Sequence, residues 1–301
     1  MSDGAVVVVS YGSTSLLEAN LVPLSCAAPH LQVVVVDSWS GPGERDRVRD
    51  LTARRGWHLV GPDHNTGFGA GADLGIDVAR RAGCDAVVLL NPDARAEAVV
   101  VDELLRAVRA EPDLLLSPRV VRPDGAPWFV GGRLDLRTGR TSTRGGAVRG
   151  AVPGSTVPWL SGACLAVSLD PWRRLGGFDP RYFLYWEDVE LSLRWRRGGG
   201  RTAVREDLSV VHEVGGTQTA SDGKTPLYVR WNCRNRLLLA GGIGPRVFLR
   251  WLVLAPSYGW EVVRRGGRRR LLRRPGLVAA ALVGTLEGAA VGARAAVRSL
   301  R

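Results

Sequence analysis

The sequence contains almost no lysine and little cysteine. Lys224 is the single lysine of the 301-residue chain, so arginine carries nearly all of the positive charge. The four cysteines are scattered, without a C-x-x-C pair, which gives no sign of a disulfide framework and indicates reduced thiols of a cytosolic protein. A charged leader followed by a long apolar region and a cleavage site is also missing, so we expect no signal peptide.

The overall composition is that of an ordinary globular protein. The hydrophobic content of 45% and charged content of 23% exclude a disordered chain, and the length allows one large domain or two smaller ones. The net charge of +12 is uneven, because residues 264–274 hold seven arginines and no acid. Such a run suits anionic lipid, nucleotide or nucleic acid, although a solvated basic face shows the same pattern.

The C-terminal part is apolar around this arginine run. Residues 247–263 include several aromatic side chains, and residues 277–297 are rich in alanine, glycine, valine and leucine but interrupted by Glu287 and Arg294. Neither is an unbroken apolar span of about 18 residues, so we expect no transmembrane helix. Apolar helices beside an arginine run fit association with a membrane surface. Packing on the rest of the chain or on a second subunit is the alternative.

The first 120 residues alternate between two hydrophobic patterns. β-branched runs predict strands at 6–10, 33–37, 57–60, 86–90 and 114–117, and helical periodicity predicts helices at 16–24, 45–55, 71–82 and 99–110. This alternation indicates an α/β sheet of parallel strands. Ligands bind such sheets beyond the carboxyl ends of the strands, where Asp37 and Asp93 fall.

The second half is less regular. Glycine, proline, threonine and arginine dominate residues 122–158, which we expect to form a loop or irregular hairpin region. A strand-like pattern resumes at 159–167, and helices are expected at 171–175, 187–197 and 227–239. Two short strands are predicted at 202–204 and 208–211, the second ending at His212.

Glu187 and Asp188 form an acid pair at the head of a predicted helix. Helix starts favour acidic residues for electrostatic reasons alone. In a catalytic role, one carboxylate would take a proton from an incoming nucleophile while the other hydrogen-bonds the acceptor. Two carboxyl groups so close push their pKa values apart.

Asp37, Asp93 and His212 each follow a predicted strand. Mg²⁺ and Mn²⁺ prefer a few carboxylate oxygens together with substrate phosphates, and a histidine at a neighbouring strand end could complete such a site. Singly, an aspartate there is a turn residue and a lone histidine is structural.

A glycine-rich turn opens the predicted helix at 71–82. Gly67, Gly69 and Ala72 fit the G-x-G-x-x-A dinucleotide pattern, but the turn does not follow the first strand of the chain as that pattern requires. Backbone amides at a helix start could approach a ligand there. A tight turn with a packed helix start is the structural alternative.

Taken in order, these motifs carry a resemblance. The chain resembles a family 2 inverting glycosyltransferase, closest to the bacterial rhamnosyltransferase-like branch, over about residues 5–240. Each motif is weak, but their order and spacing are specific. The segments that carry the resemblance are 6–11, 33–37, 65–71, 89–93, 159–163, 176–179, 185–188 and His212.

The resemblance implies a GT-A fold, an α/β fold with a mixed, mostly parallel central sheet and helices on both faces. It implies a catalytic domain over residues 1–240, with a nucleotide-sugar half at about 1–120 and an acceptor half at about 121–240. The basic and apolar residues 241–301 would form a helical C-terminal extension.

The resemblance also assigns roles to residues. Asp188 matches the catalytic base, with Glu187 beside it, and Asp93 and His212 would hold a Mg²⁺ or Mn²⁺ ion. Donor contacts are implied for Ser10, Tyr11, Asp37, Asn65, Gly67, Gly71 and Asn91. Acceptor contacts are implied for Trp159, Gly162, Ala163 and Trp186.

The sequence departs from the family pattern at three places. Asn91 stands where the family's aspartate-x-aspartate site has its first aspartate. Residues 38–40, Ser-Trp-Ser, replace the usual Asn-Gly-Ser-Thr, and Asp73 replaces a more usual asparagine. The last two put the base and sugar preferences in doubt.

The resemblance therefore implies a bacterial, metal-dependent inverting glycosyltransferase of cell-wall or polysaccharide biosynthesis. The donor is a dTDP-, UDP- or GDP-sugar, with rhamnose favoured by the resemblance, and the acceptor is a glycan, polyprenyl-linked or natural-product hydroxyl. We expect a cytoplasmic enzyme, either free or peripheral on the inner face of the membrane, and either monomeric or a homo-oligomer. A Rossmann-type NAD(P)-dependent oxidoreductase is the main alternative. A nucleic-acid-binding protein is a weaker one, because acids at the strand ends would repel nucleic acid.

Overall fold

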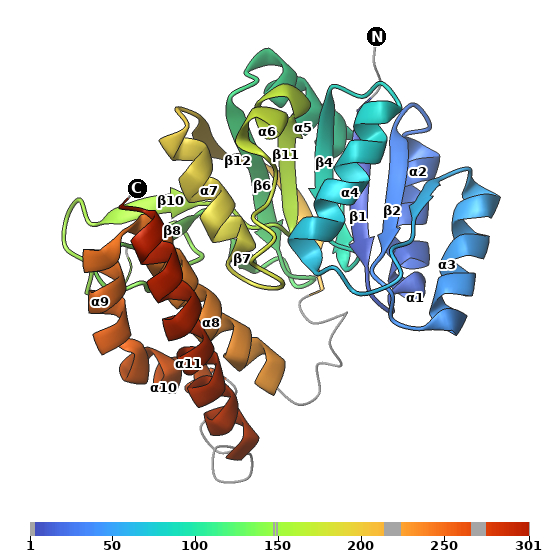
Figure 1. Cartoon of the computed structure of the whole chain (residues 1–301). Coiled ribbons are helices and arrows are strands. Elements are labelled where there is room, and N and C mark those ends of the chain that lie inside the picture. The colour runs from blue at the N-terminus through green and yellow to red at the C-terminus, as the bar shows by residue number, and fades with distance from the viewer. Residues whose placement is uncertain (1–3, 147, 149, 214–223, 266–274, 301) are drawn as a thin grey trace.

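The computed structural model describes residues 4–146, 148, 150–213, 224–265 and 275–300. In this described part, nine strands form a central sheet whose main path runs β3-β2-β1-β4-β11-β6-β12-β5, with β7 paired to β6 (Figure 1). Its strands are β1 (Ala5–Ser10), β2 (Gln32–Asp37), β3 (His58–Val60), β4 (Ala86–Leu90), β5 (Ala94–Arg95), β6 (Leu114–Val121), β7 (Pro127–Phe129), β11 (Cys164–Ser168) and β12 (Arg201–His212).

The sheet is mixed. β1 runs parallel to β2 and β4, and β6 runs parallel to β12. Between these two parallel groups, β11 is antiparallel to both β4 and β6. The two strands predicted at 202–204 and 208–211 are one strand, β12, with an irregularity between Arg205 and Ser209. This separation into two was wrong because a bulge interrupts the side-chain alternation without ending the strand.

Helices cover both faces of the sheet, as the alternation of β1 requires. Val6 and Val8 pack with the helices before β2 and after β4, whereas Val7 packs on the opposite face with the helix after β3. The helices of this part are α1 (Thr14–Leu16), the π-helix η1 (Leu17–Leu21), α2 (Val22–Ala27), α3 (Pro42–Arg55), α4 (Phe68–Arg81), α5 (Ala98–Ala110), α6 (Leu169–Leu175) and α7 (Glu187–Arg197). The helix predicted at 187–197 is confirmed at both ends.

The segment predicted as irregular, 122–158, contains strands. Besides β7, it forms β8 (Gly132–Asp135), β9 (Thr141–Ser142) and most of β10 (Thr156–Trp159), which make a second sheet in the order β10-β8-β9. Gly132 has no side chain to occupy the space that the Trp159 indole fills. The sequence pattern did not reveal these strands because they are short and rich in turn residues.

Four C-terminal helices form a unit beside the small sheet (Figure 1). They are α8 (Pro226–Ile243), α9 (Pro245–Val253), α10 (Ala255–Arg264) and α11 (Pro275–Arg298). Gly284, Gly288 and Gly292 lie one turn apart on α11 and let its backbone approach α8: a Cβ on Gly288 would lie 2.8 Å from the Arg234 carbonyl oxygen. Most of the arginine run at 264–274 lies outside the described residues.

Helix α11 corrects one expectation. It is an unbroken helix of 24 residues whose most apolar window has a mean hydropathy of 1.6, so by length and composition it could cross a membrane. Glu287 and Arg294 do not interrupt it: Glu287 binds Arg230 on α8, and Arg294 is exposed. In the described structure 28% of that window is buried, and Leu282, Val283 and Leu286 are exposed.

Candidate active site

One short segment, residues 161–163, joins the two groups of predicted catalytic residues. The amide of Gly162 donates to Asp188 Oδ2 at 3.2 Å. Next to it, the carbonyl oxygen of Ala163 accepts from the amide of Asn91 at 3.0 Å. The carboxyl end of β4 and the start of α7 therefore meet at this segment, which brings Asn91 and Asp188 to the same part of the molecule.

Asp93 and His212 form a buried pair at the ends of β4 and β12. His212 Nε2 lies 2.9 Å from Asp93 Oδ1, and both side chains are nearly inaccessible. The Trp128 ring packs 4.6 Å from the His212 ring, centroid to centroid. Asn20 on η1 donates to the Pro92 carbonyl at 2.9 Å, so the turn that carries Asp93 is held from both sides.

This pair fits a divalent cation. Mg²⁺ and Mn²⁺ are bound at about 2.1 Å in octahedral geometry, which holds adjacent ligand atoms about 3 Å apart. The 2.9 Å between Asp93 Oδ1 and His212 Nε2 matches that spacing. Among the described residues no cluster of three or more His, Cys, Asp or Glu side chains forms, so the chain would supply two ligands and leave the rest to phosphates and water.

The acid pair follows a backbone turn in the left-handed region. Tyr185 and Trp186 have φ angles of 65° and 73°, a backbone conformation that is unfavourable for residues other than glycine. Helix α8 holds this turn: Asn235 Nδ2 donates to the carbonyls of Leu184 at 3.0 Å and Tyr185 at 2.8 Å. Asn232 Oδ1 accepts from the Trp186 indole at 3.1 Å.

Burial separates the two carboxyl groups chemically. Burial raises the pKa of Asp188 to about 6, although the amides of Gly162 and Val189 donate to it and oppose this rise. Burial and the neighbouring Asp188 carboxylate raise the pKa of Glu187 well above its ordinary value. With a pKa of about 6, Asp188 is ionised at neutral pH, which is the state that a general base needs, whereas burial and the Asp188 charge favour the protonated form of Glu187.

The predicted donor contacts lie where β1 and β2 end. The side chains of Ser10, Asp37 and Ser38 are buried, and the Ser38 amide donates to the Ser10 carbonyl at 2.8 Å. Arg45 on α3 binds one carboxylate oxygen of Asp37. Asp37 Oδ1, Ser10 Oγ and Ser38 Oγ have no hydrogen-bond partner among the described residues, so three buried oxygens are available to a ligand or water.

Two exposed aromatic side chains follow these strand ends. Tyr11 is 52% exposed and Trp39 is 37% exposed. Trp39 has a φ of 48°, and the Arg45 guanidinium lies over its ring at 5.0 Å from the centroid. Arg45 thus connects the buried Asp37 to an exposed aromatic surface.

The glycine-rich turn is packed rather than open. Asn65 Oδ1 accepts from the Gly67 amide at 2.9 Å, and the Phe68 amide, the first of α4, donates to the Phe183 carbonyl at 3.2 Å. A side chain at Gly67 would collide with that carbonyl. Gly71 faces the ends of β1 and β2, since a Cβ there would lie 3.4 Å from Ser38 Oγ.

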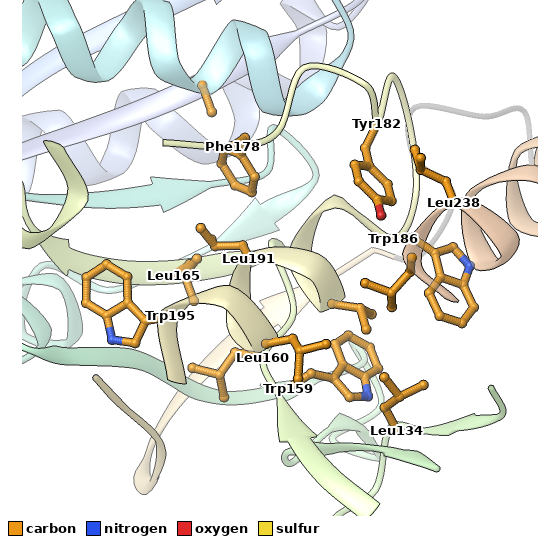
Figure 2. Packing of buried hydrophobic residues seen from close by; sticks show 14 of the residues in the cluster. Leu134, Trp159, Leu160, Leu165, Phe178, Tyr182, Trp186, Leu191, Trp195 and Leu238 are labelled. Atoms are coloured by element: carbon orange, nitrogen blue, oxygen red, sulfur yellow. The ribbon is translucent and has the colours of Figure 1, made fainter. Parts of the chain in front are cut away.

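Two predicted acceptor contacts are tryptophans of the core. Trp159 packs against Phe129, with ring centroids 5.2 Å apart. Trp186, in the packed cluster of Figure 2, has ring centroids 6.5 Å from Trp251 and 6.4 Å from Tyr258. Gly162 and Ala163 lie next to Asp188 and Asn91, as described above, so these two are nearer the reactive groups. Acceptor contact stays a prediction for all four residues.

Comparison with known proteins identifies relatives of the chain. No family model matches it. It is 30% identical over 252 residues to the N-acetylglucosaminyl-diphospho-decaprenol L-rhamnosyltransferase of Mycobacterium tuberculosis, covering 73% of this chain and 78% of the relative. It is 23% identical over 299 residues to the low-salt glycan biosynthesis hexosyltransferase Agl10 of Haloferax volcanii, covering 96% of this chain and 91% of the relative.

The chain belongs to the rhamnosyltransferase-like family 2 glycosyltransferases. Its fold is the GT-A fold. A mannosyltransferase from Pyrobaculum calidifontis, in complex with GDP-Man and Mn²⁺, superposes with a TM-score of 0.55 at 16% identity over 95% of this chain and 86% of the neighbour. GalNAc-T7 with UDP, GalNAc and Mn²⁺ superposes with a TM-score of 0.53 at 14% identity over 76% of this chain and 48% of that longer one.

This membership decides between the two enzyme classes that the sequence left open, in favour of the transferase over the oxidoreductase. The structure of the glycosyltransferase also adds residues that sequence analysis missed. Asn232 and Asn235 hold the turn before the acid pair, and Arg45 holds Asp37. No local motif marks Asn232 and Asn235, because their partners are about 50 positions away and, for Asn235, are backbone carbonyls.

Asp73 has a structural role in the glycosyltransferase. Its carboxylate accepts from the Phe178 amide at 3.0 Å and from the Trp172 indole at 3.1 Å. Burial raises its pKa to about 7. The departure at this position therefore lies in the contact of α4 with α6 and the segment that follows it.

Proposed function

We propose that this glycosyltransferase moves a sugar, with inversion, from a nucleotide-sugar donor to a hydroxyl of a lipid-linked glycan acceptor. The observation that carries the proposal is the connection of Asp188 to Asn91 through residues 161–163. A carboxylate that is ionised near neutral pH is thereby held beside the strand end that carries Asp93 and His212. A base close to a diphosphate site is what single displacement at an anomeric carbon needs.

The donor nucleotide would lie at the ends of β1 and β2. Ser10, Asp37 and Ser38 present buried oxygens without partners among the described residues, which suit the hydroxyl and N–H groups of a ribose and a base. Tyr11 and Trp39 present aromatic surface for the base. Asn65, Gly67, Gly71 and Asn91 complete the proposed donor contacts.

Asp93 and His212 would hold a Mg²⁺ or Mn²⁺ ion on the donor diphosphate. When bound, such an ion stabilises negative charge on the leaving diphosphate. Asp188 would take the proton from the acceptor hydroxyl as that oxygen attacks the anomeric carbon. Burial raises the pKa of Glu187, so Asp188 would be the base of the pair.

The identity of the substrates follows the relatives. The mycobacterial relative is named as an L-rhamnosyltransferase acting on N-acetylglucosaminyl-diphospho-decaprenol. We therefore propose dTDP-rhamnose as the donor, with UDP- and GDP-sugars as the alternatives. We propose an acceptor sugar linked through a diphosphate to a prenyl chain, rather than a soluble natural product.

The remaining features of the chain fit this substrate. Residues 1–120 and 121–240 would bind donor and acceptor, and residues 241–301 would form the extension. Leu249, Val253 and Trp260 expose apolar surface on the helices of that extension, which suits peripheral contact with the inner face of a membrane. A second subunit could cover the same surface instead. All four cysteines are free, as in a cytoplasmic enzyme.

A donor and acceptor screen tests the proposal. The purified protein is incubated with dTDP-rhamnose, UDP- or GDP-sugars, Mn²⁺ and a short-chain N-acetylglucosaminyl-diphospho-prenol, and the product is analysed by mass spectrometry and NMR. We expect transfer from one donor with inverted anomeric configuration and rates that fall on chelation. A retained configuration would refute single displacement, and transfer from none of these donors would refute the proposed donor class.

A further inference from the structure

Four arginines surround a pocket between the C-terminal helices and the loop before the acid pair. Arg181 lies on that loop, Arg234 on α8, and Arg294 and Arg298 on α11, around a volume of about 210 Å³. Leu238 and Val291 contribute apolar wall. A cationic pocket with one apolar side has the character of a site for an anionic group attached to a hydrocarbon.

Most of this positive charge is not neutralised within the described part of the chain. Arg181 binds Asp179, with Nε 2.9 Å from a carboxylate oxygen. No carboxylate in that part lies within 4.0 Å of the guanidinium nitrogens of Arg234, Arg294 or Arg298. The nearby acid of α11, Glu287, is bound to Arg230 instead.

The lack of a carboxylate partner matters most for Arg234. Its guanidinium lies over the Trp231 ring at 4.9 Å from the centroid, and burial lowers its pKa. A partly buried cation without a carboxylate partner is unfavourable, and an anion in the pocket would remove that penalty. Arginine binds phosphate oxygens in bidentate geometry better than any other side chain.

The pocket adjoins the left-handed turn that precedes Glu187 and Asp188. Arg234 donates to the Arg181 carbonyl at 3.1 Å, and the next residue, Asn235, donates to the Tyr185 carbonyl at 2.8 Å. Adjacent Cα atoms are about 3.8 Å apart, so α8 presents the pocket and the support of the acid pair from neighbouring positions. A ligand in the pocket therefore lies along the loop that leads to Glu187 and Asp188.

Helix α11 carries exposed apolar side chains on the face that bears Arg294. Val283 and Arg294 are eleven residues apart on α11, which places them on the same helical face. Val283 is exposed, and Leu286 beside it is 71% exposed. Glu287, bound to Arg230, lies between Val283 and Arg294 on this face, so a hydrocarbon chain leaving the pocket would pass this ion pair before it reached these apolar side chains.

We propose that this arginine pocket binds the diphosphate of a prenyl-linked acceptor, with the prenyl chain along α11 and the sugar toward Asp188. The inference rests on the proposed function for its acceptor class. It adds the residues that recognise that class, and it distinguishes the acceptor diphosphate from the donor diphosphate, which belongs with Asp93 and His212.

The test uses the full chain with Arg294→Gln and Arg298→Gln combined. The control is Arg196→Gln with Arg197→Gln, two exposed arginines at the end of α7 that likewise have no ion pair in the described part of the chain. Arg234 is left unchanged because it also holds the loop. Binding of citronellyl diphosphate is measured by calorimetry with the donor site saturated by dTDP and Mn²⁺.

We expect the α11 variant to bind citronellyl diphosphate about 10- to 100-fold more weakly than the wild type and the control, because charge-assisted hydrogen bonds are lost. Restoring charge with lysine at both positions should recover part of the affinity. In transfer assays, KM should rise for the diphospho-prenol acceptor and stay unchanged for an N-acetylglucosamine octyl glycoside and for the donor.

Three results would overturn the inference. One is equal affinity of wild type and α11 variant for citronellyl diphosphate. The second is an equal rise in KM for the phosphate-free glycoside, which would indicate a general structural defect. The third is unchanged diphosphate binding with loss of binding to phosphatidylglycerol vesicles, which would assign the arginines to the membrane surface. Failure of transfer by the wild type would instead count against the proposed function, since the binding assay does not require turnover.

Discussion

Replacement of Asp188 by asparagine should remove activity and stabilise the fold. The folded pKa of about 6 lies above the ordinary value of 3.8 because the carboxyl group is buried. Between these two values the folded state holds more protons than the unfolded state, so stability falls as pH rises. Above about pH 6 the wild type carries the full penalty of an ionised, desolvated carboxylate.

The magnitude follows from the size of this shift. A change of about 2 pKa units corresponds to about 3 kcal/mol. Asparagine has one carbonyl oxygen for the two amides, of Gly162 and Val189, that donate to Asp188, so one hydrogen bond worth about 1 kcal/mol is lost. The net stabilisation at pH 7.5 should be about 2 kcal/mol, which for a chain of this size raises Tm by about 4 °C.

The assay compares Tm at pH 7.5 and pH 4.5 with the rate of transfer. We expect the gain in Tm at pH 7.5 only, a loss of about 10²- to 10⁴-fold in kcat, and an unchanged KM for the donor. Wild-type kcat should rise with pH through about 6. Asp170→Asn, at the exposed start of α6, is the matched control and should change neither quantity. Full activity of Asp188→Asn, or a Tm difference independent of pH, would refute the reasoning.

Three further substitutions test the site and its supports. Asp93→Ala should abolish the Mn²⁺-dependent part of nucleotide diphosphate affinity, measured by calorimetry with and without chelator, and leave Tm within a few degrees. Asn235→Ala removes two hydrogen bonds from the left-handed turn; kcat should fall about tenfold or more and the pH midpoint of kcat should move, with the donor KM unchanged. Gly288→Leu places a side chain against the Arg234 carbonyl; overpacking should destabilise the α8–α11 contact by about 1–3 kcal/mol and speed proteolysis of the C-terminal helix, whereas Gly276→Leu, with open space around it, should not.

Each of these has a contradicting result. Nucleotide affinity of Asp93→Ala that still depends on Mn²⁺ would place the cation elsewhere. A fall in kcat of Asn235→Ala without any change in its pH profile would show a general loss of stability rather than a displaced base. Resistance of Gly288→Leu to protease, equal to that of Gly276→Leu, would mean that α11 does not depend on close contact with α8.

Much of the nucleotide-binding part of the fold could be predicted from local pattern. The β-branched runs that became β1, β2 and β4 are buried on both faces, and such strands read as unbroken hydrophobic segments. Because parallel strands end at one edge, the sequence pattern alone assigned Asp37 and Asp93 to a common edge. The acid pair at the start of α7 was visible for a similar reason, since helix starts carry a local signal.

The second sheet could not be predicted in this way. β7, β8 and β9 are two to four residues long and lie among turn residues, so their pairing depends on partners elsewhere in the chain. Trp159, which reads as the start of a strand, instead ends β10 and fills the space beside Gly132. The continuity of α11 was also missed, since a helix tolerates charged residues among its apolar ones without breaking.

The sequence by itself determined which residues could do chemistry and in what order they occur, because strand ends, helix starts and their acidic residues are set by short-range pattern. Only the tertiary structure decided which of them act together. Asp93 and His212 are 119 positions apart in sequence and 2.9 Å apart in space. Residues 161–163 link Asn91 to Asp188, and Asn235 on α8 holds the turn before the acid pair. These contacts join distant segments through backbone amides and carbonyls, which every residue possesses and no sequence pattern distinguishes.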